Sequence, residues 1–292
     1  MSEYDLNFLM KVKRLAVIAI VSDDQLMETL VLKGGNALDI AYNASGRASI
    51  DLDFSMGDAF SRDEIEKVAQ RIEKRLVETF AEKNLVAFDI RMIERPSNIS
   101  SDLVDFWGGY KVEFKIALKE KFEAAKGDLT TARRAAEVVG PAQKRIFIID
   151  ISKYELCSNK CAKEIDGFTV YVYTPEMIVC EKLRAICQQM PEYRNVVSTQ
   201  TASARARDFF DIWFVLEHIG ADIASPEFAC LLSQVFDQKK VPLSFLGELA
   251  IHKEFHRPDW PSVTATVKPG VKLDNFDFYF TYVCSRFTSF AR

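Results

Sequence analysis

One stretch of the sequence, residues 32–55 (LKGGNALDIAYNASGRASIDLDFS), constrains the fold more than any other. Gly34 and Gly35 end an apolar run, and glycine lets a backbone turn tightly and approach a ligand closely. Residues 36–42 then have helical character, whereas residues 47–55 alternate between apolar and polar side chains as a half-buried strand does. The stretch therefore predicts a turn, a helix and a strand in close succession, which is typical of an α/β protein.

Two aspartates on the predicted strand point to a cation. Asp51 and Asp53 are two positions apart, so their carboxylates share one face of the strand while Leu52 and Phe54 take the other. Like charges held together disfavour ionisation unless a cation joins them. Mg²⁺ fits, because it prefers oxygen ligands and bridges to substrate phosphates.

Each of these features has a plainer interpretation when taken alone. The glycine pair could be an ordinary turn, and the two aspartates could form a solvated strand face. A dinucleotide-binding turn is not supported, because the two glycines are adjacent rather than spaced as GxGxxG, and the acids lie within the strand.

Periodicity along the chain predicts two regions. Residues 1–174 alternate between helices and strands, and a capping-box pair at Ser61 and Glu64 opens a long charged helix. Beyond Pro175 the chain is mainly helical, with predicted helices to about Gln189 and over residues 202–219. We therefore expect an α/β domain with a mixed sheet over residues 1–174 and a mainly helical domain over 175–292. No flexible linker marks the junction, so the two are free to pack as one unit. The predicted strands of the first region are residues 86–94, 110–118, 144–152 and 168–173.

Composition excludes several classes of protein. The formal net charge of −4 argues against a general nucleic-acid coat, which needs an excess of Lys and Arg, although a local basic surface remains open. The apolar run at residues 15–21 is far too short to span a bilayer and lacks the flanks of a signal peptide. We therefore expect a soluble cytoplasmic protein. The cysteines lack the spacing of a zinc site.

Three motifs in order resemble those of one known family. LKGGNAL followed by the 47–54 pattern RASIDLDF resembles the AbiEii/AbiGii toxin family of nucleotidyltransferases, within the polymerase-beta-like superfamily. Residues 174–185 (TPEMIVCEKLRA) and 207–212 (RDFFDI) look like two further motifs of that family. The resemblance covers residues 30–215 and implies a nucleotidyltransferase-type mixed sheet flanked by helices. Beyond that point no motif aligns.

The resemblance assigns the glycine turn and the aspartate strand to nucleotide and metal. Gly34, Gly35 and Ser49 would bind the triphosphate of a nucleoside triphosphate (NTP), together with Asn36, which replaces the Thr of many relatives and caps a helix equally well. Asp51 and Asp53 would hold one or two Mg²⁺ ions. A third carboxylate is expected from a neighbouring strand, with Asp150 as the candidate and Glu113 in reserve.

The downstream motifs supply the remaining predicted site residues. Lys182 would contact phosphate, although a surface lysine paired with a nearby acid is the plainer interpretation. Asp208 and Asp211 share a helix face; they would orient Lys182 or bind the nucleotide, and Asp211 matches the acid of the family. Further residues could line the same edge or meet substrate phosphates: Arg47, Arg194, Arg205 and Arg207.

The resemblance implies a Mg²⁺-dependent toxin that transfers nucleotides from NTP to RNA, at the 3′ end of tRNA, and that a separately encoded antitoxin neutralises. Two alternatives stay open. The acceptor could be a small molecule or a protein, or the chain could inhibit growth by binding NTP without transfer. The basic residues within 111–145 alternate with acids, which favours a solvated surface over an RNA-binding one. The aromatic residues at 276–280 are expected in the core.

Overall fold

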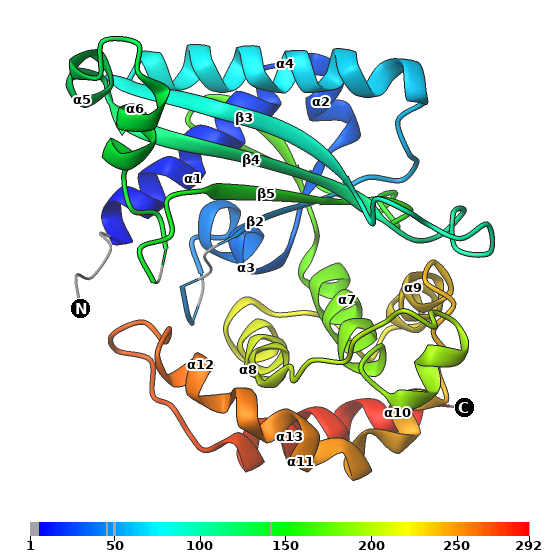
Figure 1. The fold of residues 1–292 in the computed structure, drawn as a ribbon. Coiled ribbons are helices and arrows are strands. Elements are labelled where there is room, and N and C mark those ends of the chain that lie inside the picture. Colours follow the sequence, from blue (N-terminus) through cyan, green and yellow to red (C-terminus); the bar gives the residue numbers. More distant parts are fainter. Residues whose placement is uncertain (1–5, 45, 49–50, 141, 292) are drawn as a thin grey trace.

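The computed structural model describes residues 6–44, 46–48, 51–140 and 142–291, so the predicted site residue Ser49 lies outside the described part. Its centre is a seven-stranded mixed sheet with the order β3-β4-β5-β2-β1-β7-β6 (Figure 1). The strands are β1 (Val31–Leu32), β2 (Leu52–Ser55), β3 (Leu85–Arg95), β4 (Gly109–Leu118), β5 (Phe147–Ser152), β6 (Cys161–Ile165) and β7 (Phe168–Val172). The predicted mixed sheet is confirmed; β6 is an edge strand that the sequence pattern did not reveal.

The register of the sheet brings distant acids together. Strand β2 runs parallel to β5, and Asp53 pairs with Asp150 across the two strands. Strand β1 pairs antiparallel with β2 and parallel with β7. The prediction of a strand over 47–55 is too long, because Arg47 forms an isolated bridge with Val267 instead of joining the sheet. Asp51 therefore lies immediately before the strand.

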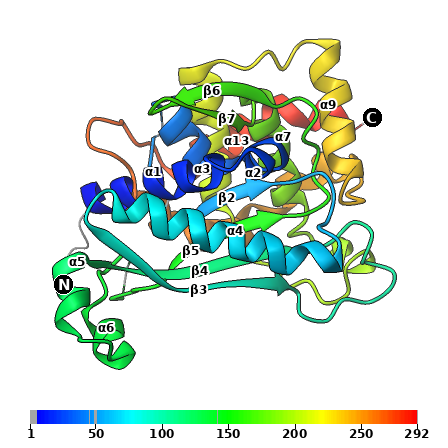
Figure 2. The ribbon, with the colours of Figure 1, turned by 90° about the horizontal axis from the view of Figure 1, so that it is seen from above.

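Helices cover the sheet because each has an apolar stripe to bury. Helices α1 (Leu6–Val21) and α4 (Arg62–Ala81) pack against each other over the sheet (Figures 1 and 2). Helix α4 begins at the predicted capping box, in which the Ser61 backbone N–H donates to the Glu64 carboxylate. The other helices of this region are α2 (Asp24–Thr29), α3 (Gly34–Asn36), continued by the π-helical turn η1 (Ala37–Ala41), α5 (Lys119–Ala124) and α6 (Leu129–Ala135).

The chain after residue 174 is helical, as predicted, and faces the sheet region across the molecule (Figure 1). Its helices are α7 (Pro175–Cys187), α8 (Ala206–Phe214), α9 (Pro226–Asp237), α10 (Phe245–Glu248), α11 (Lys253–His256), α12 (Trp260–Thr264) and α13 (Phe276–Phe287). Short helical turns join them: η2 (Pro191–Asn195), η3 (Val215–Ile219), η4 (Leu249–His252), η5 (Arg257–Asp259) and η6 (Thr288–Ala291). Among the described residues, none of the helices combines the length and the apolar character needed to cross a bilayer.

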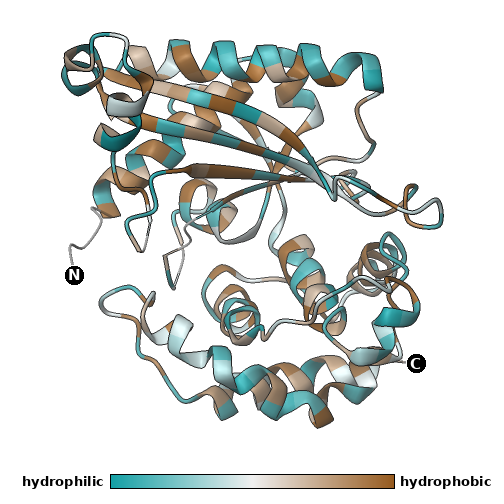
Figure 3. Cartoon of the chain, in the orientation of Figure 1, coloured by the Kyte–Doolittle hydropathy of each residue, from teal (hydrophilic) through white to brown (hydrophobic). Residues whose placement is uncertain are grey.

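Aromatic side chains build the core of the helical region. Phe209 on α8 packs against Phe276 and Phe280 of α13. Of the aromatic residues expected in this core, Phe278 is the exception: 42% of it is exposed, because it lies on the outer side of α13. One cluster of buried apolar residues runs through both regions, and apolar faces turn inward in both (Figure 3). The division at residue 174 into two domains remains a proposal.

Candidate active site

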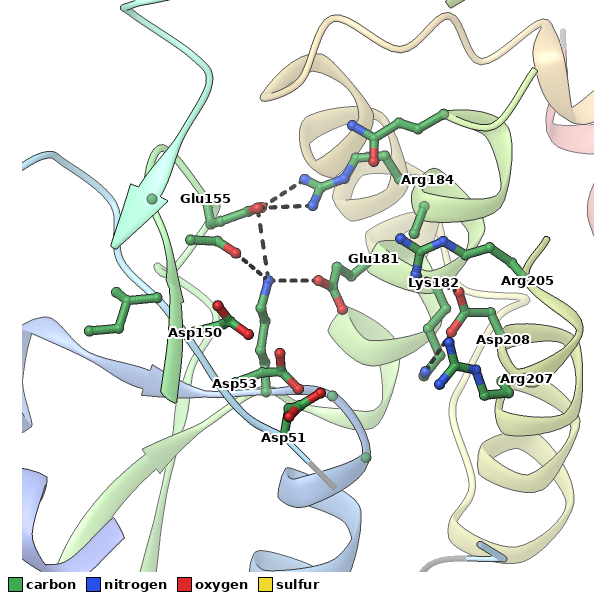
Figure 4. Close-up of a pocket in the computed structure, with 18 of the residues that line it drawn as sticks. Asp51, Asp53, Asp150, Glu155, Glu181, Lys182, Arg184, Arg205, Arg207 and Asp208 are labelled. Atoms are coloured by element: carbon green, nitrogen blue, oxygen red, sulfur yellow. Dashed lines mark hydrogen bonds and ion pairs between the residues drawn. The ribbon is translucent and has the colours of Figure 1, made fainter. Parts of the chain in front are cut away.

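A cavity of about 990 Å³ separates the sheet from the helical region, and residues of both regions line it (Figure 4). The Gly34–Gly35 turn and the ends of β2 and β5 line the sheet side. Helices α7 and α8 and the segment around Thr266 line the opposite side. Residues far apart in the sequence therefore meet at one opening.

Three aspartates form the acidic wall of the cavity: Asp51, Asp53 and Asp150. Burial raises the pKa of Asp53 to about 7, and the Glu181, Asp150 and Asp51 charges add to this while Lys33 opposes it. Burial and the Asp51 charge also raise the pKa of Asp150. The acidic wall therefore gathers negative charge that the described side chains only partly neutralise.

The glycine turn lies against this wall. Gly34 has φ +65°, a conformation that side chains other than glycine rarely adopt, and a Cβ there would lie 3.3 Å from Asp53 Oδ2. The Lys33 backbone N–H donates to the Asp53 carbonyl at 3.0 Å. Asn36 is buried, and its side-chain amide donates to the Asp51 carbonyl. Asn36 therefore holds the aspartate strand in place and does not line the cavity.

Lys33 links the acidic wall to helix α7. Its Nζ lies 2.8 Å from Glu181 Oε1 and 3.1 Å from Ser152 Oγ (Figure 4). Burial alone would lower the pKa of Lys33, but the carboxylates of Glu181 and Glu155 outweigh burial and raise it. Lys33 therefore stays charged beside the aspartates, and it joins the sheet to the helical region.

A second buried contact joins the two regions. Arg184 on α7 donates to both carboxylate oxygens of Glu155, at 2.8 and 3.1 Å. Lys239 Nζ lies 3.6 Å from Glu155 and donates to the backbone carbonyls of Phe106 and Lys153. Burial opposes ionisation of Glu155, yet the three surrounding cations lower its pKa to about 2. This ion cluster fixes helix α7 relative to the sheet.

The wall opposite the aspartates is called the cationic wall here. It consists of Lys182 on α7, Arg205 and Arg207 at the start of α8, and Arg47 before β2. Lys182 Nζ lies 3.0 Å from Asp208 Oδ1 and 2.7 Å from Asp211 Oδ2. Arg47 donates to both oxygens of Asp211, at 2.8 and 2.6 Å. Burial would raise the pKa of Asp208, but Lys182 and Arg205 outweigh it and lower that pKa well below its usual range. Acids and cations are therefore already matched on this wall.

The C-terminal region completes the opening. The Ala48 backbone N–H donates to the Thr266 carbonyl at 2.8 Å, and the Lys268 N–H to the Gly46 carbonyl at 2.9 Å. Lys268 Nζ also lies 2.5 Å from Asp39, the acid that follows the glycine turn. Residues for which the sequence supplied no motif thus clamp the segment that leads into Asp51.

Most of the predicted site residues meet at this cavity. Among the described ones, these line it: Gly34, Gly35, Arg47, Asp51, Asp53, Asp150, Lys182, Arg205, Arg207 and Asp208. Asp211 is buried behind the cationic wall, and Arg194 is not among the lining residues. Glu113 pairs with Lys111 at 2.7 Å and is absent from the lining, so Asp150 is the better placed of the two candidate third carboxylates.

Sequence reasoning missed part of the site. Lys33 and Glu181 directly precede the glycine pair and Lys182, so their position in the motifs was an available signal. Arg184 lies in the same α7 motif. Glu155 and Lys239 carry no motif, and only the packing of the sheet against the helices reveals them.

The acidic wall suits a divalent cation in chemistry and placement. Carboxylate oxygens are the ligands that Mg²⁺ prefers, and the raised pKa of Asp53 indicates carboxylates that a cation would stabilise. Within the described part of the chain, no three acidic, histidine or cysteine side chains already lie close enough to hold an ion. The aspartates would therefore have to draw together about it.

A glycine turn and paired aspartates of a mixed sheet face cations across the cavity, and the class of enzyme follows from this arrangement together with the family that the chain matches. This is a nucleotidyltransferase. A family model described as the nucleotidyl transferase AbiEii toxin of a type IV toxin–antitoxin system matches residues 17–282. The chain belongs to this family, as the motifs predicted.

Comparisons with individual proteins give distant likenesses. No curated protein matches the chain. Among solved structures, JHP933 from Helicobacter pylori is 16% identical with a TM-score of 0.49, covering 98% of this chain and 94% of its own. The nucleotidyltransferase toxin MenT4 from Mycobacterium tuberculosis is 14% identical with a TM-score of 0.47, covering 97% of this chain and 82% of its own.

Proposed function

We propose that this nucleotidyltransferase toxin transfers a nucleotide from NTP to the 3′ end of an RNA, tRNA being the expected acceptor, in a Mg²⁺-dependent reaction. The cavity itself is the observation that carries the proposal: an acidic wall of Asp51, Asp53 and Asp150 faces a cationic wall across space for a nucleotide. A cognate antitoxin and a cytoplasmic location belong to the same proposal.

The acidic wall would bind the metal. Asp51, Asp53 and Asp150 would hold Mg²⁺, which when bound neutralises phosphate charge and lowers the pKa of an attacking hydroxyl. The backbone of Gly34 and Gly35 would approach the triphosphate, since no side chain of this turn blocks it. Nucleotidyl transfer needs mainly positioning and charge stabilisation, which these groups supply.

The cationic wall would bind phosphate through Lys182. A lysine ammonium has three donors, and in the described structure Asp208 and Asp211 accept from two of them. One donor is left for a phosphate oxygen. Asp211 is buried and bonded to both Arg47 and Lys182, so its proposed role is to position Lys182.

Two arginines favour a phosphate-rich acceptor. The side chains of Arg205 and Arg207 are 38% and 51% exposed and line the cavity. They contact the acids Asp208 and Asp259 at 3.1 and 3.6 Å. By contrast, several basic residues of 111–145 are paired with acids, including Lys115 with Asp89, so that face adds little.

Label transfer tests the proposal. Total tRNA and Mg²⁺ would be incubated with each α-labelled NTP in turn. Wild-type protein should label RNA, and Asp51→Ala/Asp53→Ala should label it at least about a thousandfold more slowly, because each aspartate would be a metal ligand. The matched control Asp58→Ala/Asp237→Ala removes two exposed aspartates and should label normally.

The other outcomes decide between the remaining functions. Label on a protein or small molecule would replace the RNA acceptor by that class. NTP binding without label on any acceptor would favour a toxin that sequesters nucleotide. Expression of the chain alone should slow growth and Asp51→Ala/Asp53→Ala should not; unaffected growth would count against the toxin proposal.

A further inference from the structure

One end of the cavity lies beside Lys239, whose Nζ is 6.0 Å from the centre of the Trp107 ring, and it holds residues that the transfer chemistry does not use. Pro96, Trp107 and Gln188 line this end, with Gly108 and Gly109 between it and the end of β5. A Cβ on Gly109 would clash with the Ile151 carbonyl oxygen, so the close approach of β4 to β5 requires glycine there. Lys111 on β4 pairs with Asp150, so the Cα of Trp107, four residues earlier, lies at most about 14 Å from that of Lys111. This is within the reach of an extended nucleotide.

Trp107 is held as a rigid aromatic surface. Its ring lies 6.4 Å from that of Phe106 and 6.3 Å from that of Tyr193, centroid to centroid. The next residue, Gly108, has φ +113°, and a Cβ there would lie 3.0 Å from the Arg95 carbonyl. Glycine is therefore required at the bend that directs the chain from Trp107 into β4.

Tyr193 joins Trp107 to Gln188 and fixes the Gln188 amide. The Tyr193 hydroxyl donates to the Lys239 carbonyl at 2.7 Å. Its only hydrogen is thereby used, so it accepts from Gln188 Nε2 at 3.2 Å. The side-chain oxygen Oε1 of Gln188 is consequently turned away from Tyr193, whereas the backbone carbonyl of Gln188 accepts from Gln200 Nε2 at 2.8 Å.

We propose that Trp107 and Gln188 form a nucleobase subsite, in which the base stacks on the Trp107 ring and a base amino group donates to Gln188 Oε1. This deepens the proposed function and rests on it, because it names the part of the substrate that this end of the cavity would bind. Aromatic stacking accepts any base. Adenine and cytosine carry an exocyclic amino group where uracil carries a carbonyl oxygen, so Gln188 favours adenine and cytosine over uracil.

Two substrates carry a nucleobase, the incoming NTP and the terminal nucleotide of the acceptor. The Gly34–Gly35 turn and Trp107 line one cavity, which favours the incoming NTP, whose phosphates would lie on the turn. The experiment therefore measures NTP binding first and acceptor binding second.

Nucleotide binding without transfer is the first measurement. ATP, CTP, GTP, UTP and inorganic tripolyphosphate would be titrated into the full chain in the presence of Mg²⁺ and without acceptor. Trp107→Ala should raise the Kd of every NTP about tenfold, because stacking is lost. The Kd of tripolyphosphate should stay unchanged, which also shows that the variant is folded.

Fluorescence provides a second readout with a matched control. Trp107→Phe keeps an aromatic ring, so it should retain NTP affinity while losing the tryptophan quenching that a stacked base causes. Trp213→Phe removes a tryptophan of the helical core that is outside the cavity lining, and should keep the quenching. Gln188→Leu should bring the Kd of ATP and UTP to within about twofold of each other.

The acceptor arm separates the two sources of the base. If Trp107→Ala leaves the NTP Kd unchanged but raises the KM for RNA about tenfold, the subsite binds the terminal base of the acceptor. If neither value changes, the nucleobase subsite is wrong. Failure of label transfer with normal NTP binding would overturn the transfer reaction and leave the subsite testable by the titration.

Discussion

Both walls of the cavity contain aspartates, but neighbouring charges shift the pKa values of these aspartates in opposite directions. On the sheet side, burial and neighbouring carboxylates raise the pKa of Asp53 to about 7. On the helical side, Asp208 and Asp211 are buried more completely than Asp53, yet Lys182, Arg205 and Arg47 lower both pKa values despite burial. Each buried aspartate on α8 has its cation within the protein.

The difference indicates which wall a cation from outside the protein would stabilise. An acid whose charge the protein already neutralises has a structural role, whereas carboxylates with raised pKa values are suited to a cation from outside. The cationic wall is thus a preformed support, and the acidic wall is where Mg²⁺ would act.

The largest effect on stability is expected when the cationic wall loses Lys182. Breaking a buried ion pair by removing one partner costs about 3–5 kcal/mol. We expect about 3 kcal/mol for Lys182→Met, because Arg205 and Arg47 still contact Asp208 and Asp211. Urea unfolding would measure it.

Two further variants make that result specific. Lys182→Met/Asp208→Asn should recover part of the loss, since one uncompensated charge is removed with the lysine. Lys74→Met breaks an exposed pair with Glu78 and should cost under about 0.5 kcal/mol. Equal stability of Lys182→Met and the wild type would contradict the preformed wall.

Ionisation of Asp53 on the acidic wall should destabilise the protein as pH rises, whereas ionisation of Asp208 should stabilise it. The folded pKa of Asp53 is raised from 3.8 to about 7. The free energy of unfolding is therefore unaffected by this group below pH 4, falls as pH rises from 4 to 7, and stays lowered above pH 7. A full shift of this size is worth about 4 kcal/mol; we expect about 2 kcal/mol because the cavity is open to water. Asp53→Asn should therefore be more stable than wild type at pH 8, and equally stable near pH 4.

Asp208→Asn is the matched comparison for that pH series. The folded pKa of Asp208 is lowered, so its charge stabilises the protein at neutral pH and the benefit is lost as pH falls below 4. Asp208→Asn should be less stable than wild type at pH 8, with a difference that shrinks in acid. The same sign for Asp53→Asn and Asp208→Asn would break the contrast between the walls.

The smallest effect is expected at the C-terminal clamp. Lys268 is partly exposed, so Lys268→Met should cost at most about 1 kcal/mol of stability. Its pair with Asp39 holds the segment leading to the aspartates, so the transfer rate should fall several-fold. Lys272→Met, an exposed lysine of the same segment, should leave the rate unchanged. Equal rates for both variants would remove the clamp from the account.

Much of the fold follows from local signals in the sequence. The Ser61–Glu64 capping box, Pro175 and the alternating strands mark elements whose type the local sequence decides. Strand β6 (Cys161–Ile165) was not predicted from the sequence, because an edge strand is half-exposed and its residues show little alternation between apolar and polar side chains. The start of β2 was misjudged because the bridge of Arg47 to Val267 depends on tertiary contacts.

The candidate site was predictable where it lies in motifs. The aspartates, the glycine pair and Lys182 stand at recognisable spacings and meet at one cavity. Glu155, Lys239 and Thr266 were not predictable, because each acts through a partner brought near only by packing of the helical region on the sheet. Trp107 gave no signal either, since a single tryptophan in a loop is not a motif.

Binding of Mg²⁺ distinguishes the two walls in one experiment. A ligand of the folded state at about 100 times its Kd adds about 2.7 kcal/mol of stability, so the rise in Tm on adding Mg²⁺ at pH 8 reports the site. The account predicts a rise of several degrees for wild type and Asp208→Asn. It predicts no rise for Asp53→Asn, and a much smaller rise for wild type at pH 5. If Mg²⁺ raised the Tm of Asp53→Asn as much as that of wild type, or failed to raise the Tm of Asp208→Asn alone, the proposal that the acidic wall binds Mg²⁺ would be contradicted.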